Sequence, residues 1–563
     1  MRLRGLWVSW LLVLCAGLNS CKPEPKPAAE TAVSPPEPEK TIELLFTYGS
    51  EKEAWIKSAT QAFHASKAKT PDGKVIHINA QAKGSGELID ALIAGTDHAH
   101  IASPASLAFV KLGNAQWRAK SGKDLIGPTE SLLLSPVVIA MWQPMAEALG
   151  WGKKPVGWQE ILTLAKDPRG WDAHGYPQWG RFKFGHTHPQ YSNSGLISLF
   201  AEVYAASGKM TGLTPADVAK PETAVFLSDI ERSVVHYGSS TGFFGKKMFA
   251  NGPSYMSAAV LYENMVIEAA ISEKALPFPI VAIYPREGTF WSDHPAGIVE
   301  REWVTPAHRE AAKVYFAFLL ALDQQKQAMA LGFRPAAAEI ALTAPFDAAH
   351  GVNPREPQST LEVPTVETMD AIMRLWKDNK KRSNVTLVMD VSGSMNENRR
   401  IENARFGASQ LIDLLGDSDS FRLMAFNEKV FPSAPAAQLG KSRSKALRDS
   451  ASLMADGGTA LYDAISKAYQ DQLADAQQHP DEISAIVVLT DGADTNSTLK
   501  LDDLLKQIRF DSESHNIRVF TIGYDSGGQK DALQKIADAT QARFFDGKPE
   551  NIRAVFKEIS TFF

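Results

Sequence analysis

The last third of the chain alternates between short apolar runs and segments of helical periodicity. The apolar runs, typical of buried strands, cover residues 385–390, 420–426, 483–490, 517–523 and 542–546. Helical patterns separate them at about 400–415, 441–453, 460–476, 499–509 and 530–539, with a closing one near 550–561. Strand–helix alternation favours a mostly parallel, doubly wound sheet. We therefore predict an α/β domain over residues 382–563.

The preceding part, residues 41–377, opens with three strand patterns that each end in a turn rich in Gly or Ser. The strands predicted at 42–46, 75–82 and 99–102 run into turns that contain Ser50, Ser85 and Ser103. Hydroxyls and free N–H groups at the start of a helix suit polar or anionic ligands. Ser and Gly are also ordinary turn and capping residues, so a single serine of this kind is weak evidence for a site.

Two long apolar runs divide this part into lobes. Leu132–Met141 and Phe278–Tyr284 flank an inserted segment with its own alternating pattern. Such strands can cross between two α/β lobes and leave a ligand cleft between them. We expect the first lobe at about residues 41–131 and 285–377, and the second at about 142–275.

The first residues have the layout of a secretory signal. Two arginines precede an apolar run, residues 6–17, that is too short for a convincing membrane span. The next segment, Leu18–Cys21, is similar to the cleavage box of bacterial lipoproteins, which implies that Cys21 becomes the acylated first residue. An ordinary secretory signal that contains a cysteine is the alternative. Of the two cysteines, Cys15 lies in the part that would be removed, so no disulfide is expected.

Residues 21–40 are dense in proline and charge, a composition that favours an extended tether over a packed core. At about 3.1 Å per residue, such a tether reaches roughly 60 Å. We expect residues 1–20 to be a lipoprotein signal peptide, and lipid on Cys21 to anchor the protein in a bacterial cell envelope. Lys22 stands where an aspartate usually marks retention in the inner membrane, which favours the outer membrane if the cell has one.

Length and charge set further limits. A chain of 563 residues is too long for one core, so two or three folding units are expected. The formal net charge is −5 and the sequence contains no basic block, which argues against a nucleic-acid partner. The sequence also lacks a G-x-x-x-x-G-K-[ST] phosphate loop and a G-x-S-x-G nucleophile turn, so we expect no enzymatic activity.

The strongest chemical signal follows the first strand of the C-terminal domain. Asp390, Ser392 and Ser394 form a D-x-S-x-S loop, and one carboxylate with two hydroxyls suits a hard cation such as Mg²⁺. Thr459 precedes a later helical segment, and Asp491 ends a later apolar run. Because the carboxyl ends of parallel strands meet in one crevice, these five residues can converge there. The alternative is that the two aspartates only cap the following helices.

This arrangement resembles the metal-ion-dependent adhesion site of von Willebrand factor A domains, whose five positions occur here in the expected order. The resemblance implies direct coordination by Ser392 and Ser394, with Thr459 joining in some states. Asp390 and Asp491 would hold the cation directly or through water. The resemblance further implies an open coordination position that a carboxylate of a partner protein can fill. Mg²⁺ is the expected ion, with Mn²⁺ and Ca²⁺ as alternatives.

Most of residues 41–377 resembles a bacterial extracellular solute-binding protein. The resemblance includes the segments Pro285–Gly297 and Phe333–Ala336. It implies a small polar or anionic solute in the cleft, and as ligand contacts Ser50, Ser85, Ser103, Ser194 and Tyr262. His186 and His188 are spaced like a metal pair, but no third ligand is evident nearby in the sequence. A loop that positions the following helix is therefore the favoured interpretation.

Together these patterns predict a cell-envelope lipoprotein that binds a small solute in a two-lobed cleft and a protein partner through a divalent cation. The alternative is the binding subunit of an ABC-type importer, with the C-terminal domain as a docking accessory and other chains crossing the membrane. A hydrolase is the least favoured interpretation, since Ser392 stands where a phosphoryl-transferring D-x-D loop needs its second aspartate.

Overall fold

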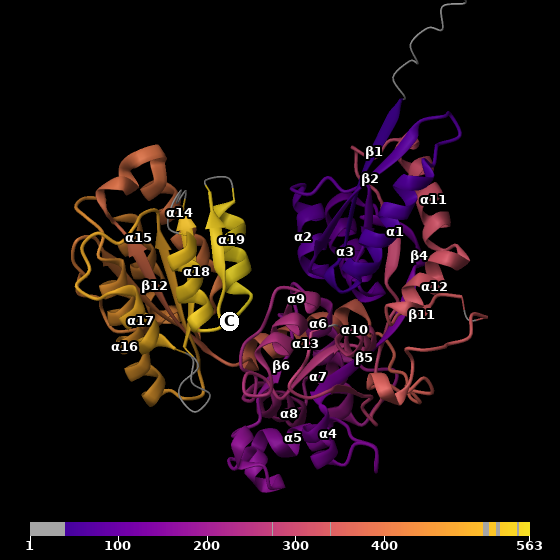
Figure 1. The fold of residues 1–563 in the computed structure, drawn as a ribbon, viewed down its shortest axis with the longest axis horizontal. Helices are drawn as coiled ribbons and strands as arrows, with labels where there is room; N and C mark the ends of the chain where they lie inside the picture. The colour runs from indigo at the N-terminus through magenta and orange to yellow at the C-terminus, as the bar shows by residue number, and fades with distance from the viewer. Residues whose placement is uncertain (1–39, 273, 338, 510–516, 525–529, 549–550) are drawn as a thin grey trace, which may run out of the picture. The chain divides into compact units, whose positions relative to one another are not determined.

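The computed structural model describes residues 40–272, 274–337, 339–509, 517–524, 530–548 and 551–563 (Figure 1). The predicted signal peptide 1–20, the acylation site Cys21 and the tether up to residue 39 lie outside these ranges. Within the described ranges, no helix is long and apolar enough to cross a membrane.

A five-stranded sheet in the order β2-β1-β3-β10-β4 forms the centre of the first lobe (Figure 1). Its strands are β1 (Thr41–Gly49), β2 (Val75–Lys83), β3 (Ile101–Ser103), β4 (Ile126–Ser131) and β10 (Pro295–Val299). The helices of this lobe are α1 (Glu53–Ser66), α2 (Ser85–Ala94), α3 (Leu107–Ser121), α11 (Pro306–Leu319) and α12 (Leu322–Ala330). Because β1 pairs in parallel with β2 and β3, these strands end at the same edge, where α2 and α3 begin.

A second sheet has the long strand β5 (Leu133–Trp142) at its centre. Strand β5 pairs with β7 (Ala258–Tyr262), β8 (Ile280–Ile283), β9 (Trp291–Ser292) and β11 (Arg334–Pro335), and β6 (Phe184–Gly185) pairs with β7. The surrounding helices are α4 (Gln143–Leu149), α5 (Trp158–Lys166), α6 (Asn193–Ser207), α7 (Pro215–Val218), α8 (Pro221–Glu231), α9 (Thr241–Asn251), α10 (Glu263–Ile271) and α13 (Val366–Asn379). Residues Val137–Trp142 are all buried, as expected for a strand that is covered on both faces.

The passages of the chain between the two lobes differ in part from the prediction. The first passage joins β4 to β5, as the apolar run at 132–141 predicted. The prediction that Phe278–Tyr284 forms the second passage is wrong, because β8, which lies in this run, pairs with β5 inside the second sheet. The chain returns between β9 and β10, around His294. Apolar length alone could not separate an inner strand from a crossing strand, since both are buried.

The segment 334–379 belongs with the second lobe, whereas we expected all of residues 285–377 in the first. Strand β11 pairs with β5, and α13 packs against α6, α7 and α8. The backbone N–H of Ala282 also donates to the carbonyl of Gly351 at 2.8 Å. Helix α13 attaches through an apolar face, whose buried residues include Met369, Ile372 and Trp376. The outer boundaries of the two predicted regions, 41–377 and 382–563, stay predictions.

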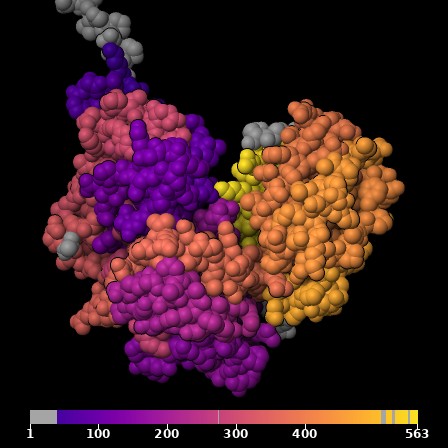
Figure 2. Space-filling model, turned by 180° about the vertical axis from the view of Figure 1, so that it is seen from behind, coloured from indigo at the N-terminus to yellow at the C-terminus, as the bar shows by residue number. Residues whose placement is uncertain are grey.

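The C-terminal domain is built on a six-stranded sheet in the order β14-β13-β12-β15-β16-β17. The strands are β12 (Ser383–Asp390), β13 (Ser420–Phe426), β14 (Ala437–Gln438), β15 (Ile483–Thr490), β16 (Arg518–Tyr524) and β17 (Phe544–Gly547). All neighbouring pairs are parallel except β13 with the edge strand β14. This topology confirms the predicted α/β fold class, and the space-filling view shows the domain as one body in orange to yellow (Figure 2).

Helices cover both faces of this sheet. They are α14 (Arg400–Leu414), α15 (Leu439–Ala451), α16 (Leu461–Gln478), α17 (Leu501–Ile508), α18 (Lys530–Ala539) and α19 (Ile552–Ser560). Helix α14 packs against α15 and α19, whereas α17 packs against α16 and α18. Val385, Leu387 and Met389 of β12 join the core beside α14 and α19, and Val388 joins the core beneath α16, α17 and α18. Burial on both faces explains why the middle of β12, residues 385–389, is almost entirely apolar.

Candidate functional site

Two neighbouring strands bring predicted cation ligands to one edge of the C-terminal sheet. Strands β12 and β15 pair in parallel, with Met389 opposite Leu489, so both end at the same edge. Asp390 is the last residue of β12, and Asp491 directly follows β15. Thr459 lies in the loop that leads into α16. Each of these residues is therefore placed by the end of a strand or the start of a helix.

Hydrogen bonds join the loop after β12 to the end of β15. The Ser392 and Ser394 hydroxyl oxygens lie 3.2 Å apart, and the Ser394 hydroxyl donates to Asp491 Oδ1 at 2.9 Å. The backbone N–H of Ser392 donates to Asp390 Oδ1 at 2.8 Å. The hydroxyl of Thr490, the last residue of β15, donates to Asp390 Oδ2 at 2.6 Å. Both serines and both aspartates thus form one connected cluster.

Thr459 faces the same space as this cluster. A Cβ atom added to Gly492 would lie 3.9 Å from both the Ser394 and the Thr459 hydroxyl oxygens. The backbone N–H of Thr459 donates to Thr495 Oγ1 and to Asn496 Oδ1, each at 3.1 Å. The loop after β15 therefore fixes Thr459 beside the serines, and the structure brings all five predicted residues together.

The oxygen atoms of this site fit a hard divalent cation. The set contains two carboxylates and three hydroxyls, which suits Mg²⁺, Mn²⁺ or Ca²⁺ better than a soft metal. Burial raises the pKa of Asp390 to about 6, and the Asp491 carboxylate adds to this rise. A positive charge between the two would favour their ionised forms. Among the residues that the structure describes, no group of three His, Cys, Asp or Glu side chains could hold a metal, so the hydroxyls are essential to this assignment.

A cationic side chain that the sequence analysis did not single out enters this site. Arg400 is the first residue of α14, and its Nη1 donates to Asp491 Oδ2 at 2.7 Å. The same nitrogen donates to the carbonyl of Ser394 at 3.3 Å. The Asp491 side chain is fully buried and that of Arg400 is 13% exposed, so water screens this ion pair weakly. The D-x-S-x-S pattern does not mark Arg400, because its role depends on where α14 begins.

Three of the predicted solute contacts come from the first lobe: Ser50 and Ser85 follow β1 and β2, and Ser103 is the last residue of β3. The Ser50 hydroxyl accepts from the backbone N–H of Gly242 in the second lobe at 3.1 Å. The Ser85 hydroxyl accepts from the backbone N–H of Ala105 at 2.9 Å. The buried Ser103 hydroxyl has no hydrogen-bond partner within the described part of the chain. Ser50 and Ser85 therefore bond to protein here, whereas the Ser103 hydroxyl keeps its capacity to bond a ligand.

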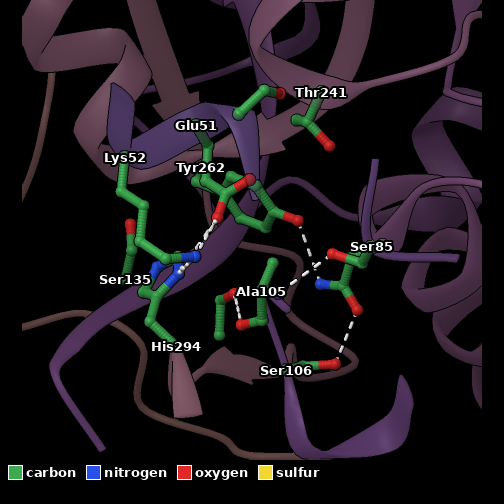
Figure 3. A network of polar contacts seen from close by, with 12 residues as sticks. Glu51, Lys52, Ser85, Ala105, Ser106, Ser135, Thr241, Tyr262 and His294 are labelled. Carbon is green, nitrogen blue, oxygen red and sulfur yellow. Dashed lines mark hydrogen bonds and ion pairs between the residues drawn. The ribbon is translucent and has the colours of Figure 1, made fainter. Parts of the chain in front are cut away.

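The other two predicted solute contacts, Ser194 and Tyr262, lie at the starts of α6 and α10. The Ser194 and Thr187 hydroxyls bond to each other at 2.9 Å. The Tyr262 hydroxyl accepts from the side-chain amide of Asn193 at 2.9 Å. Asn193 accepts in turn from the Ser106 hydroxyl of the first lobe at 2.5 Å, so one amide joins the two lobes (Figure 3). Ser106 and Asn193 therefore lie beside the predicted solute contact Tyr262, although the sequence analysis did not name them.

A buried ionic cluster lies where the chain returns between the lobes. Lys52 Nζ lies 2.8 Å and His294 Nδ1 lies 3.2 Å from Glu51 Oε1 (Figure 3). Burial alone would raise the pKa of Glu51, but Lys52 and His294 lower it to about 2. Burial lowers the pKa of both Lys52 and His294. The His294 ring lies 5.9 Å from the ring of Tyr262, so this cluster places charge beside the predicted solute contacts.

His186 and His188 are both buried and bonded to protein groups. The ring nitrogens of His186 lie 2.8 Å from the Thr187 carbonyl and 3.0 Å from Glu231 Oε1. Nδ1 of His188 accepts from the backbone N–H of Gln190 at 3.3 Å. Among the described residues, no group of three His, Cys, Asp or Glu side chains around this pair could hold a metal ion. These contacts favour the interpretation of the loop as a support for α6.

Comparisons with known proteins match the two parts of the chain separately. A family model for the von Willebrand factor type A domain matches residues 384–558. A family model for bacterial extracellular solute-binding proteins matches residues 129–354. Among curated proteins, inter-alpha-trypsin inhibitor heavy chain H4 of Sus scrofa is 27% identical over 151 residues. That match covers 25% of this chain and 16% of the relative.

Solved structures also resemble one part or the other. A von Willebrand factor type A structure from Catenulispora acidiphila is 25% identical, with a TM-score of 0.29, over 32% of this chain and 42% of its own. A periplasmic thiamin binding protein is 14% identical, with a TM-score of 0.44, over 61% of this chain and 97% of its own. The sulfate-binding protein SubI from Mycobacterium tuberculosis H37Rv is 17% identical, with a TM-score of 0.37, over 56% of this chain and 93% of its own. None of these similarities is close enough to indicate what this chain binds.

Proposed function

Because this chain combines a bacterial extracellular solute-binding region with a C-terminal von Willebrand factor type A domain, we propose that it has two binding functions. A small polar or anionic solute binds in the two-lobed cleft, and a protein partner binds at the edge of the C-terminal sheet. Asp390, Ser392 and Ser394 hold a divalent cation at that edge, with Thr459 and Asp491 completing the site. When bound, the cation supplies a coordination position for a carboxylate of the partner.

The meeting of five oxygen-bearing side chains from three separate loops supports this proposal most directly. Both carboxylate oxygens of Asp390 accept a hydrogen bond that orients the side chain, one from the Ser392 N–H at 2.8 Å and one from the Thr490 hydroxyl at 2.6 Å. The Ser394 hydroxyl is oriented by Asp491 at 2.9 Å. Contacts of this kind pre-position the ligands of a metal site. The chain therefore prepares the site, and the cation and the partner complete it.

We also propose that the protein is a lipoprotein of the bacterial envelope, anchored through Cys21. The support is the signal-like segment before Cys21, the proline-rich tether after it, and the extracellular family that residues 129–354 match. The outer membrane is favoured where the cell has one. Labelling of cells with a palmitate analogue should mark the wild-type protein, and labelling of Cys21→Ser at the same level would exclude this anchor.

A pull-down from gently solubilised envelopes tests the proposed partner site. The bait is the full chain, used in Mg²⁺, in EDTA, and as the variant Asp390→Ala. We expect a partner that is retained in Mg²⁺ and lost both in EDTA and with Asp390→Ala. Asp502→Ala, which removes an exposed carboxylate from α17, is the matched control and should retain the partner. A partner that is retained under every condition would contradict cation-mediated binding.

The binding subunit of an ABC-type importer is the second candidate function. The two-lobed body with polar helix starts on both sides of its cleft favours it. In that case a permease should bind the body of residues 41–377, and EDTA should leave that complex intact. The same pull-down separates the two functions, since only the first requires the cation.

A further inference from the structure

The proposed cation site contains a positive charge that belongs to the chain itself. Arg400 Nη1 donates to Asp491 Oδ2 at 2.7 Å, while Asp491 Oδ1 accepts from the Ser394 hydroxyl at 2.9 Å. One oxygen of this carboxylate therefore bonds to a predicted cation ligand, and the other bonds to a guanidinium. Because the Asp491 side chain is fully buried, the interaction between these charges is stronger than it would be on an open surface.

The backbone before α14 is shaped so that Arg400 reaches the site. Asn398 and Arg399 both have left-handed φ angles, 48° and 59°, a conformation that residues other than Gly adopt rarely. Helix α14 starts directly after them, at Arg400. The nearby Glu397 lies 3.6 Å from Arg400 and is 69% exposed, whereas the Asp491 side chain beside the same guanidinium is fully buried. The position of Arg400 thus depends on the loop that also carries the two serines.

We propose that Arg400 is a built-in counter-ion that keeps the affinity of this site for divalent cations low. Asp390 and Asp491 supply two negative charges, and Arg400 neutralises one of them. An incoming divalent cation therefore gains less from the carboxylates and is repelled by the guanidinium. This inference rests on the proposed function, because it requires that the site around Asp390 binds a cation.

Arg400→Gln tests the charge while it keeps a donor for Asp491. It should tighten Mn²⁺ binding about tenfold or more, since it removes a positive charge close to the cation. Arg400→Lys keeps the charge and should bind Mn²⁺ within about threefold of the wild type. Arg399→Gln is the matched control, because it removes the same charge from an exposed neighbour, and it should also match the wild type.

The measurement is calorimetric titration of the full-length proteins with Mn²⁺ and with Mg²⁺, and Asp390→Ala serves as the variant without the site. Tighter binding by Arg400→Gln alone supports the inference. Unchanged or weaker cation binding by Arg400→Gln overturns the inference. It is also overturned if Arg400→Lys or Arg399→Gln binds the cation as tightly as Arg400→Gln does. Wild-type protein that binds the ion no better than Asp390→Ala would instead overturn the proposed cation site itself.

Discussion

Each carboxylate of the proposed cation site is oriented by a side chain that is not a predicted ligand. The Thr490 hydroxyl bonds to Asp390 at 2.6 Å, and the Arg400 guanidinium bonds to Asp491 at 2.7 Å. Supporting contacts of this kind fix the direction in which a ligand atom points. The Thr490 hydroxyl is neutral and leaves the negative charge of Asp390 uncompensated. The Arg400 guanidinium is positive and compensates the negative charge of Asp491.

We expect the stability of the protein to depend on pH because of another buried cluster, in the second lobe, that contains Glu202 and His186. Burial raises the pKa of Glu202 from 4.5 to about 8. Burial lowers the pKa of His186, but the nearby Glu231 carboxylate outweighs burial, and the net shift is upward from 6.5. Both groups bind their proton more tightly in the folded state. Their contribution to stability therefore falls as the pH rises, from about 4.5 to 8 for Glu202 and above 6.5 for His186.

Glu202→Gln should remove the larger part of this pH dependence. The Ser198 hydroxyl donates to Glu202 Oε1 at 2.7 Å, and glutamine keeps that acceptor without a charge. We expect the variant to melt about 5 °C or more above the wild type at pH 8, and close to it at pH 5. Melting curves from pH 5 to pH 8 measure this difference, with Glu222→Gln on the exposed face of α8 as the control. Equal slopes for the wild type and Glu202→Gln would contradict this assignment.

At the scale of residues, ligands that are close together in the sequence could be predicted, whereas contacts between distant residues could not. Asp390, Ser392 and Ser394 follow a strand at short, regular spacing, so the sequence shows them together. Arg400 and its partner Asp491 are 91 residues apart, and no local pattern links them. The structure brings the five predicted ligands together, and their binding of a cation stays a prediction.

At the scale of elements, short runs rich in apolar residues predicted the long strands of the C-terminal sheet. The predicted strands at 385–390, 420–426, 483–490, 517–523 and 542–546 are confirmed by β12, β13, β15, β16 and β17. The edge strand β14 has two exposed residues, too few to show any period. The error over Phe278–Tyr284 has another cause, because a sequence does not show which strand an apolar run pairs with.

One arginine connects the segment 334–379 to the rest of the second lobe through hydrogen bonds. Arg334, in β11, donates from Nε and Nη2 to the two carboxylate oxygens of Glu263, each at 2.7 Å. It also donates to the backbone carbonyls of Pro354 at 3.3 Å and Glu356 at 2.6 Å. The Glu263 side chain is fully buried at the start of α10. This side chain therefore links β11, α10 and the loop around residue 355.

Arg334→Met should lower the free energy of unfolding by about 3–5 kcal/mol, because it leaves the charge of Glu263 buried without its partner. Urea denaturation of the whole protein, followed by tryptophan fluorescence, measures the loss. The matched control is Arg355→Met, which removes an exposed arginine from the same region and should change stability by about 0.5 kcal/mol or less. A loss for Arg334→Met no larger than that of the control would contradict the role of this ion pair.

At the scale of the whole molecule, the two lobes of the solute-binding region contact each other directly. The backbone N–H of Gly86, in α2, donates to the carbonyl of Tyr191 at 2.9 Å. A Cβ atom added to Gly86 would lie 1.9 Å from the carbonyl oxygen of Gln190. Only a residue without a side chain fits between these segments. The two lobes are therefore closed against each other at Gly86.

Gly86→Ala should prevent this closure and hold the lobes apart. We expect a larger radius of gyration in small-angle X-ray scattering, and loss of about 1–3 kcal/mol of stability if the lobes are forced together. The loop at Gln190 and Tyr191 would have to move, since the clash involves backbone atoms. Scattering curves and melting temperatures that match those of the wild type would show that the contact at Gly86 does not control closure.

The proposed binding of a protein partner requires that the edge of the C-terminal sheet binds a divalent cation through Asp390. Thermal unfolding of the full chain with and without Mg²⁺ tests this most directly. A ligand at about a hundredfold excess over its Kd stabilises the folded state by about 2.7 kcal/mol. We predict that Mg²⁺ raises the Tm of the wild type and of Asp502→Ala, and leaves that of Asp390→Ala unchanged. Equal shifts in the wild type and Asp390→Ala, or no shift in the wild type, would contradict the cation site.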